Sequence, residues 1–322
     1  MASLLSVENL QVQFQTKKGI NTAVDGVSFS VEKGRILGIV GESGCGKSVT
    51  SMSILQLLGS NARISGGSIK LDGKELIGLP EKEMCRIRGN DIAMIFQDPM
   101  TALNPTLTIG TQLMEPIMLH QNCGKKEAWT RAVDVLKRVG IAAPEKRMKE
   151  YPHQLSGGMR QRVMIAMAVS CEPRLLIADE PTTALDVTIQ AQILELMCEL
   201  REKMGTAIML ITHDMGVVAE TADDVLVLYA GKAVEYGSIE DIFERPKHPY
   251  TQGLLNSIPR LGEDVELLNT IEGTVPAPDA MPAGCRFAPR CPYGKDRCMK
   301  EKPGVYHAGN SLVSCFRYEG EK

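Results

Sequence analysis

The clearest candidate for chemistry in the sequence is a glycine-rich stretch at residues 41–48, which reads GESGCGKS. It fits the phosphate-binding pattern G-x-x-x-x-G-K-S/T, known as the P-loop. Its glycines let backbone N–H groups turn toward phosphate oxygens, and Gly46 opens a helix whose positive dipole end faces them. Lys47 would reach the β- and γ-phosphates, and the Ser48 hydroxyl would bind Mg²⁺. We assign nucleotide contacts to Gly41, Ser43, Gly44, Cys45, Gly46, Lys47, Ser48 and Val49.

An acidic pair ends a second apolar run, residues 175–180, which reads LLIADE. Adjacent side chains at a strand end point in different directions. Asp179 can therefore serve Mg²⁺ through water, while Glu180 polarises an attacking water. Acidic residues at strand ends are common, so the pair takes its meaning from the P-loop upstream.

A third motif, residues 155–162, reads LSGGMRQR. Ser156, Gly157 and Gly158 open a helix and offer a second positive helix end to a γ-phosphate. Read alone, the motif also fits a serine N-cap followed by a flexible Gly-Gly pair. Together with the P-loop and the acidic strand end, it resembles the signature motif of ATP-binding cassette (ABC) transporter ATPases. Met159 departs from the glutamine of many members, and we expect nucleotide binding to survive this difference.

The resemblance implies an ATPase that uses ATP and Mg²⁺ and works as a head-to-tail dimer. Each ATP then lies between the P-loop of one subunit and the signature motif of the other. The remaining family motifs follow in order along the chain. They assign Gln97 as a Mg²⁺ or water ligand, Asp186 to the D-loop at residues 184–186, His213 as the switch histidine and Phe14 as an adenine-stacking residue. A core role for Phe14 is an equal alternative.

The elements around these motifs indicate an α/β fold. Residues 35–40 form an apolar run before the P-loop, and residues 47–58 predict the helix after it. Further expected elements are strands at 10–14, 27–31, 175–178 and 207–211, helices at 128–139 and 189–204, and a hairpin over 224–237. Alternating strands and helices favour a parallel sheet covered on both faces. The fold class implied is an ABC-type P-loop NTPase with a mainly parallel core sheet, an antiparallel β subdomain and a helical subdomain at about 99–172.

Composition excludes several other classes of protein. The chain has 322 residues, 43% of them hydrophobic and 23% charged, which rules out a disordered or collagen-like chain. The net charge of −3 gives no reason to expect nucleic acid as the main partner. No apolar run approaches the roughly 20 residues that span a bilayer, and the start lacks the pattern of a secretory signal. We expect a protein that stays in the cytoplasm and reaches the membrane only through partners.

Two further stretches narrow the resemblance to one branch of the family. Residues 99–105 (PMTALNP) and 248–259 (HPYTQGLLNSIP) look like the dipeptide/oligopeptide/nickel importer branch, and the chain is most similar to its D-type ATPases. This implies two transmembrane permease subunits, a second related ATPase or a second copy of this chain, and, indirectly, an extracellular solute-binding protein. The expected location is the cytoplasmic side of the membrane. The solute stays open among dipeptides, oligopeptides and nickel.

The composition changes near residue 240, which divides the chain into an ATPase domain at 1–240 and a C-terminal module at 241–322. Nine of the 17 prolines lie after this point, together with Cys285, Cys291, Cys298 and Cys315. Four thiolates can hold a [4Fe–4S] cluster or a tetrahedral zinc ion, and the spacing alone leaves iron–sulfur, zinc and unligated thiols open. The resemblance to dipeptide-permease ATPases favours the cluster. The cluster charge would be offset by Arg286, Arg290, Lys295 and Arg297.

The alternative function is a non-transport ABC ATPase that acts on nucleic acid or on ribosomes. Such proteins usually carry long coiled-coil insertions or two cassettes in one chain. This sequence has one P-loop, one signature motif and no heptad tract. A P-loop kinase or GTPase is a third class, and the LSGG segment and His213 speak against it. The leading hypothesis is therefore ATP hydrolysis coupled to solute import.

Overall fold

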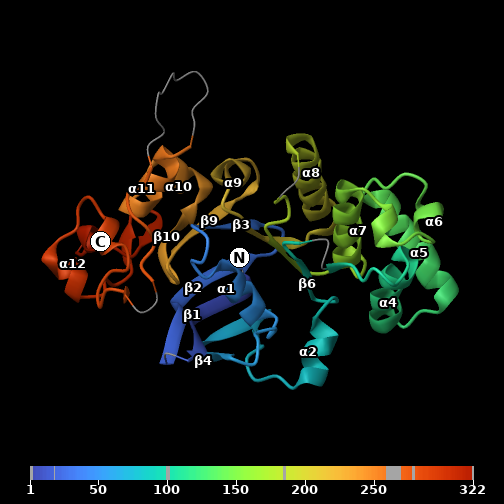
Figure 1. Ribbon diagram of the computed structural model, residues 1–322, viewed down its shortest axis with the longest axis horizontal. Helices are drawn as coiled ribbons and strands as arrows, with labels where there is room; N and C mark the ends of the chain where they lie inside the picture. Colours follow the sequence, from blue (N-terminus) through green and yellow to red (C-terminus); the bar gives the residue numbers. More distant parts are fainter. Residues whose placement is uncertain are drawn as a thin grey trace.

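A computed structural model describes residues 3–17, 19–98, 102–183, 186–258, 270–277 and 280–320. It contains two sheets (Figure 1). The smaller sheet is antiparallel in the order β2-β1-β4-β5, with bounds β1 Ser3–Thr16, β2 Gly19–Glu32, β4 Ala62–Leu71 and β5 Lys74–Glu75. The expected strands at 10–14 and 27–31 lie in the C-terminal halves of the longer strands β1 and β2, where apolar side chains alternate with more exposed ones.

The larger sheet runs in the order β11-β12-β10-β9-β3-β8-β7-β6. Its parallel centre is made of β9 Asp224–Tyr229, β3 Ile36–Val40, β8 Ala207–Ile211, β7 Leu175–Asp179 and β6 Ile92–Ile95. All residues of β3, β7 and β8 are buried, as expected for strands covered on both faces. Because parallel strands end at the same edge, the loops after β3, β7 and β8 meet there.

Helices cover this sheet and form a lobe at one side. The cover includes α1 Lys47–Ile54, α8 Val187–Met204, α9 Met215–Thr221 and α10 Ile239–Glu244, and α2 Glu81–Ile87 follows β5. The lobe contains α4 Ile109–Gln121, α5 Lys125–Arg138, α6 Pro144–Arg147, η1 Pro152–Gln154 and α7 Gly157–Val169 (Figure 1). It packs around buried aliphatic side chains such as Leu113, Ile117 and Leu136. These elements lie within the range of about 99–172 in which the sequence predicts a helical subdomain, and the bounds of that subdomain stay a prediction.

One predicted helix is shorter than its sequence signal. The pattern at 47–58 predicts a helix closed by Gly59, but α1 ends at Ile54. Gln56 has a left-handed φ of 50°, which breaks the helix. The Arg88 guanidinium donates hydrogen bonds to the carbonyls of Leu55 at 2.8 Å and Gln56 at 3.2 Å. This cap comes from a residue about thirty positions away, so the local sequence could not indicate it.

The C-terminal region is built onto the larger sheet. It contains α11 Pro249–Asn256, η3 Ala288–Arg290, α12 Asp296–Lys300, β11 Tyr306–Ala308, β12 Ser311–Val313 and η4 Phe316–Tyr318. The expected hairpin at 224–237 is present as β9 and β10 Lys232–Ser238. Strand β12 pairs with β10, so residues after 240 extend the same sheet rather than standing apart from it. The division at residue 240 stays a prediction.

Among the helices of the described ranges, none is both long and apolar enough to cross a membrane.

Candidate nucleotide-binding site

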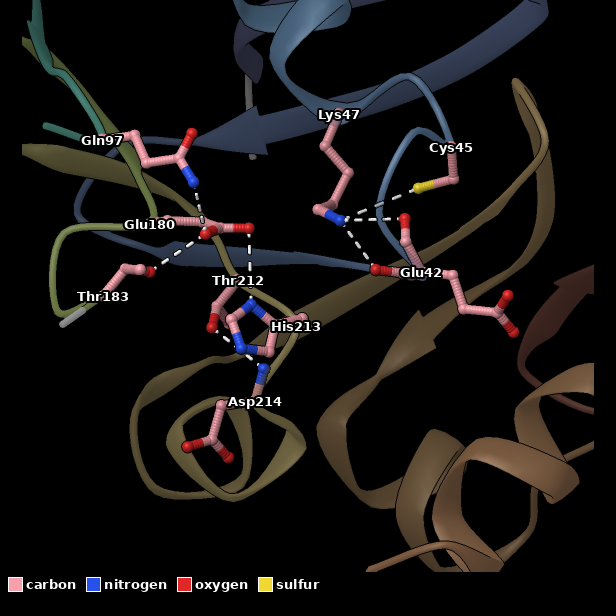
Figure 2. A network of polar contacts seen from close by, with 10 residues as sticks. Glu42, Cys45, Lys47, Gln97, Glu180, Thr183, Thr212, His213 and Asp214 are labelled. Atoms are coloured by element: carbon pink, nitrogen blue, oxygen red, sulfur yellow. Dashed lines mark hydrogen bonds and ion pairs between the residues drawn. The ribbon is translucent and has the colours of Figure 1, made fainter. Parts of the chain in front are cut away.

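The P-loop residues lie between β3 and α1, as the sequence predicts. Gly46 is the N-cap of α1 with a φ of 100° and offers no side chain to the first N–H groups of the helix. Those N–H groups therefore suit an anion. Lys47 is only 6% exposed, and its Nζ donates to the carbonyls of Gly41 at 2.6 Å and Glu42 at 3.2 Å (Figure 2). The lysine ammonium thus lies across the loop that would surround the phosphates.

Close packing explains the first glycine of the loop. A Cβ on Gly41 would lie 2.1 Å from the Leu228 carbonyl oxygen, and its φ of 150° also disfavours a side chain. Cys45 is buried beside it, and burial raises the pKa of this thiol, so it stays neutral at pH 7. Ser43, Gly44 and Ser48 are exposed along the same loop, and Val49 is half-buried.

Asp179 has the properties of a metal ligand. It ends β7 and is only 4% exposed, and its Oδ1 is buried without a hydrogen-bond partner. Burial raises the pKa of this carboxyl above its usual value, and a hydrogen bond from Ser48 only partly opposes the shift. A buried, unpartnered carboxylate oxygen beside a hydroxyl suits a hard cation such as Mg²⁺. The residues present therefore fit the predicted magnesium site.

Glu180 lies at the centre of a polar network (Figure 2). Its Oε2 accepts hydrogen bonds from Gln97 Nε2 and from Thr183 Oγ1, both at 2.9 Å, and its Oε1 lies 3.4 Å from His213 Nδ1. Burial alone would raise the pKa of Glu180, but the contacts with Thr183 and His213 and the charge of Lys47 outweigh it and lower the pKa. The structure thus brings the predicted Mg²⁺ or water ligand Gln97 and the predicted switch histidine His213 to Glu180. The Glu180 carboxylate is ionised at neutral pH.

The local backbone conformation orients the side chains of this network. Glu180 has a left-handed φ of 46°, uncommon for a residue with a side chain and typical of functional sites. After β8, the Thr212 hydroxyl accepts the N–H of Asp214, and Asp214 caps α9 by accepting from Gly216 and Val217. His213 is held between these two contacts and is largely exposed. Sequence reasoning missed Thr183, although its place three residues after Glu180 was a signal.

The signature residues lie in the helical lobe, away from α1 (Figure 1). Ser156 caps α7 by accepting the N–H of Met159 at 3.3 Å, and Gly157 and Gly158 form the first turn of that helix. The serine is therefore an N-cap, and the assignment of these three residues to a γ-phosphate stays a prediction. With Gly157, Gly158 and Asp186, Ser156 lines an open cavity of about 530 Å³ that no P-loop residue lines. Asp186 caps α8 at Ile189, while residues 184–185 of the D-loop lie outside the described residues.

Phe14 does not join the P-loop in the structure. It is half-buried in β1 and lines a cavity of about 220 Å³ with residues such as Gln13, Ile20 and Asn61. It also packs against the core of the smaller sheet. Its assignment to adenine stays a prediction.

Comparisons with known proteins identify the family. The family model described as "ABC transporter" matches residues 24–183, and "Oligopeptide/dipeptide transporter, C-terminal region" matches residues 234–298. The chain is 56% identical to the oligopeptide transport ATP-binding protein AppD of Bacillus subtilis, over 100% of this chain and 98% of that protein. It is 51% identical to the oligopeptide transport ATP-binding protein OppD of Escherichia coli, over 98% and 93% of the two chains. The chain belongs to the ABC transporter ATP-binding proteins.

Solved structures agree with this membership of the ABC family. The dimeric structure of MJ0796, a bacterial ABC transporter cassette, matches with a TM-score of 0.66 at 28% identity and covers 73% of this chain and 98% of that one. A second MJ0796 structure, at 27% identity with the same TM-score and coverage, is a post-hydrolysis state bound to ADP and Pi. The predicted fold class and ATPase class are confirmed, and ATP-driven peptide transport is supported over the non-transport alternative.

The four C-terminal cysteines of this ABC protein surround one cavity of about 80 Å³, which His248 and Lys295 also line. The backbone N–H of Cys285 donates to the carbonyl of Cys298 at 2.7 Å. Burial, reinforced by the other three sulfurs, raises the pKa of the Cys285 thiol to about 11. Within the described ranges, however, no three His, Cys, Asp or Glu side chains are grouped closely enough to hold a metal ion.

The basic residues near these cysteines have other partners. Arg286 pairs with Asp25 at 3.1 Å, Arg290 pairs with Glu42 at 2.9 Å, and Arg297 pairs with Glu301 and Glu319. These three arginines are thus paired with carboxylates, and the expectation that they offset the charge of a cluster stays a prediction. Lys295, which lines the cavity, remains placed for that role.

Proposed function

We propose that this ABC ATPase uses Glu180 to orient and polarise the water that attacks ATP. The position of its carboxylate carries the proposal, because one oxygen is held by Gln97 and Thr183 and the other lies beside His213. The lowered pKa keeps the carboxylate ionised, the form that can accept a proton. Buried Lys47 would contact the phosphates, and His213 would contact the γ-phosphate.

Magnesium would be held by Ser48 and Asp179, with Gln97 as a further ligand or as a ligand to water. When bound, Mg²⁺ neutralises charge on the phosphate oxygens. The unpartnered Oδ1 of Asp179 supports this assignment.

We infer that two such ATPases bind ATP head to tail. The signature residues and Asp186 line a cavity between the helical lobe and α8 that no P-loop residue lines. Helices α7 and α1 lie apart in Figure 1. A second subunit could present its signature residues to the P-loop of this chain. The dimeric MJ0796 cassette supports such an arrangement. The second subunit is another copy of this chain or a related ATPase.

The transported solutes in this proposal are dipeptides and oligopeptides. The names of AppD and OppD support peptides over nickel. The ATPases would work at the cytoplasmic side of the membrane with two transmembrane permease subunits, and an extracellular binding protein would deliver the solute. ATP would close the dimer, and hydrolysis would reopen it.

Uptake by a reconstituted transporter tests the whole proposal. The chain, its permeases and its partner ATPase would be placed in vesicles loaded with ATP, and the binding protein and a labelled di- or tetrapeptide would be added outside. We expect peptide to accumulate with ATP and not with a non-hydrolysable ATP analogue. Nickel accumulation without peptide uptake would correct the solute. ATPase activity stimulated by DNA or ribosomes, without uptake, would contradict the transport assignment.

We further propose that Cys285, Cys291, Cys298 and Cys315 ligate a [4Fe–4S] cluster, with zinc as the alternative. The shared cavity supports a common ligand, although the sulfurs would have to approach one another to bind it. The thiols of Cys285 and Cys315 are half-buried, and their raised pKa values favour the protonated form, whereas a metal would stabilise the thiolates. The role would be structural, as a staple for a region rich in loops.

Metal analysis after purification without oxygen is expected to find about four irons and four acid-labile sulfides per chain. Cys298→Ser should lower both contents. Cys85→Ser should leave them unchanged, because Cys85 is an exposed thiol of α2 outside the cavity. A measured content of one zinc per chain without sulfide would show that the four cysteines bind zinc instead of an iron–sulfur cluster. An active protein that contains neither iron nor zinc would contradict the proposal.

A further inference from the structure

Arg290, in the C-terminal region, contacts the P-loop directly. Its Nη1 donates to both carboxylate oxygens of Glu42, at 3.0 and 2.9 Å. Its other nitrogens donate to the carbonyls of Ile271 at 3.1 Å and Glu272 at 2.9 Å. The arginine side chain is only 6% exposed. A guanidinium bound on all sides in this way is held in one position.

A second contact fixes the backbone of the same glutamate. The N–H of Glu42 donates to the Tyr250 hydroxyl at 2.9 Å. Tyr250 is fully buried and packs edge-on against Tyr229, with ring centroids 4.7 Å apart, and against Phe287 at 5.4 Å. Both the backbone and the side chain of Glu42 are therefore bound by residues more than 200 positions later.

The charge of Glu42 gives these contacts a function. Glu42 follows Gly41 at the start of a loop that would bind a triphosphate, and an unpaired carboxylate there would repel it. In Figure 2 the Glu42 carboxylate points away from the Lys47 ammonium. Both oxygens of that carboxylate accept hydrogen bonds from Arg290. We propose that Arg290 is a positioning residue of the nucleotide site, which turns the Glu42 carboxylate away from the phosphates and neutralises its charge. The inference rests on the proposed nucleotide site.

Equilibrium binding of Mg·ATP to the full chain, measured by calorimetry, tests this role. Arg290→Gln is expected to weaken ATP binding about tenfold, because it leaves a carboxylate unpaired beside the loop. Arg290→Lys keeps the charge and should lose less. The double variant Glu42→Gln/Arg290→Gln should recover most of the affinity, because the repelling charge is gone. A purely structural arginine would not be rescued in this way.

The matched control is Arg297→Gln, which removes an exposed arginine of the same region paired with Glu301 and Glu319 and should bind ATP like the original chain. Arg290→Gln that binds ATP normally, or a double variant as weak as Arg290→Gln, would overturn the proposal. If Arg290→Gln does not fold, the ATP affinities of Arg290→Lys and of the double variant can still be compared with that of the original chain. A wrong assignment of the nucleotide site would give a different result from a wrong assignment of Arg290. In that case the original chain would bind no ATP, or the Lys47→Ala variant would bind ATP as tightly as the original chain.

Discussion

Replacing Glu180 by glutamine is expected to lower ATP turnover by about 10³-fold while Mg·ATP still binds, because a general base typically contributes 10²–10⁴-fold. Glutamine keeps the size of the side chain and an oxygen for Gln97 and Thr183, but it cannot take a proton from water. Turnover would be measured with the complete transporter, and binding with the purified chain. The expected result is an ATP-bound dimer that opens slowly.

Two matched variants give this result its meaning. Glu195→Gln changes an exposed glutamate of α8 and should hydrolyse ATP at the original rate. Thr183→Val removes one of the hydrogen bonds to Glu180 and should reduce turnover by a smaller factor, roughly tenfold. Full turnover in Glu180→Gln would show that another group activates the water and would refute the assignment.

The pKa of Glu180 predicts the sign of a pH effect within the same experiment. The pKa of Glu180 in the folded protein lies below the usual glutamate pKa. At a pH equal to the usual glutamate pKa, most Glu180 carboxylates are therefore still ionised. The ionised Glu180 carboxylate stabilises the folded protein at pH values above its pKa in the unfolded chain. This stabilisation is lost as the pH falls through its lower pKa in the folded protein. Acid inactivation near neutral pH would therefore have to come from another group.

Most of the nucleotide site could be predicted because its motifs are local. The P-loop, the end of β7 and the residue after β8 are each specified by a few consecutive residues, and the parallel sheet places them at one edge. The grouping of Gln97, Glu180 and His213 came from the family resemblance, because no local pattern indicates that residues 97 and 213 both meet residue 180.

The contacts that the sequence did not indicate are long-range ones. The pairing of Arg290 with Glu42 depends on how the C-terminal region packs against β9 and the P-loop. The addition of β12 to the larger sheet likewise depends on pairing between distant strands. A composition change near residue 240 indicated a new region, but composition carries no information about which sheet edge such a region covers.

Asp179→Asn is expected to act on stability and on nucleotide binding in opposite directions. The folded protein disfavours the Asp179 carboxylate, since burial raises its pKa and Oδ1 has no partner. Because the folded pKa lies above the unfolded one, this ionised group costs stability at neutral pH. Asparagine removes the charge, so the chain without nucleotide should gain roughly 1 kcal/mol in free energy of unfolding. The same change removes a ligand of Mg²⁺, so added Mg·ATP should no longer raise the melting temperature.

Thermal unfolding with and without Mg·ATP separates these two effects, and Asp134→Asn is the control. Asp134 is an exposed residue of α5 whose only role in the described structure is a surface pair with Lys137, so its replacement should change neither melting temperature. If Asp179→Asn lowers stability without nucleotide, the carboxylate is a structural partner rather than a strained ligand. If it keeps the full stabilisation by Mg·ATP, the metal is held by other residues. A gain in stability combined with the loss of the Mg·ATP effect is the pattern expected when a buried carboxylate is kept for a metal at the expense of the fold.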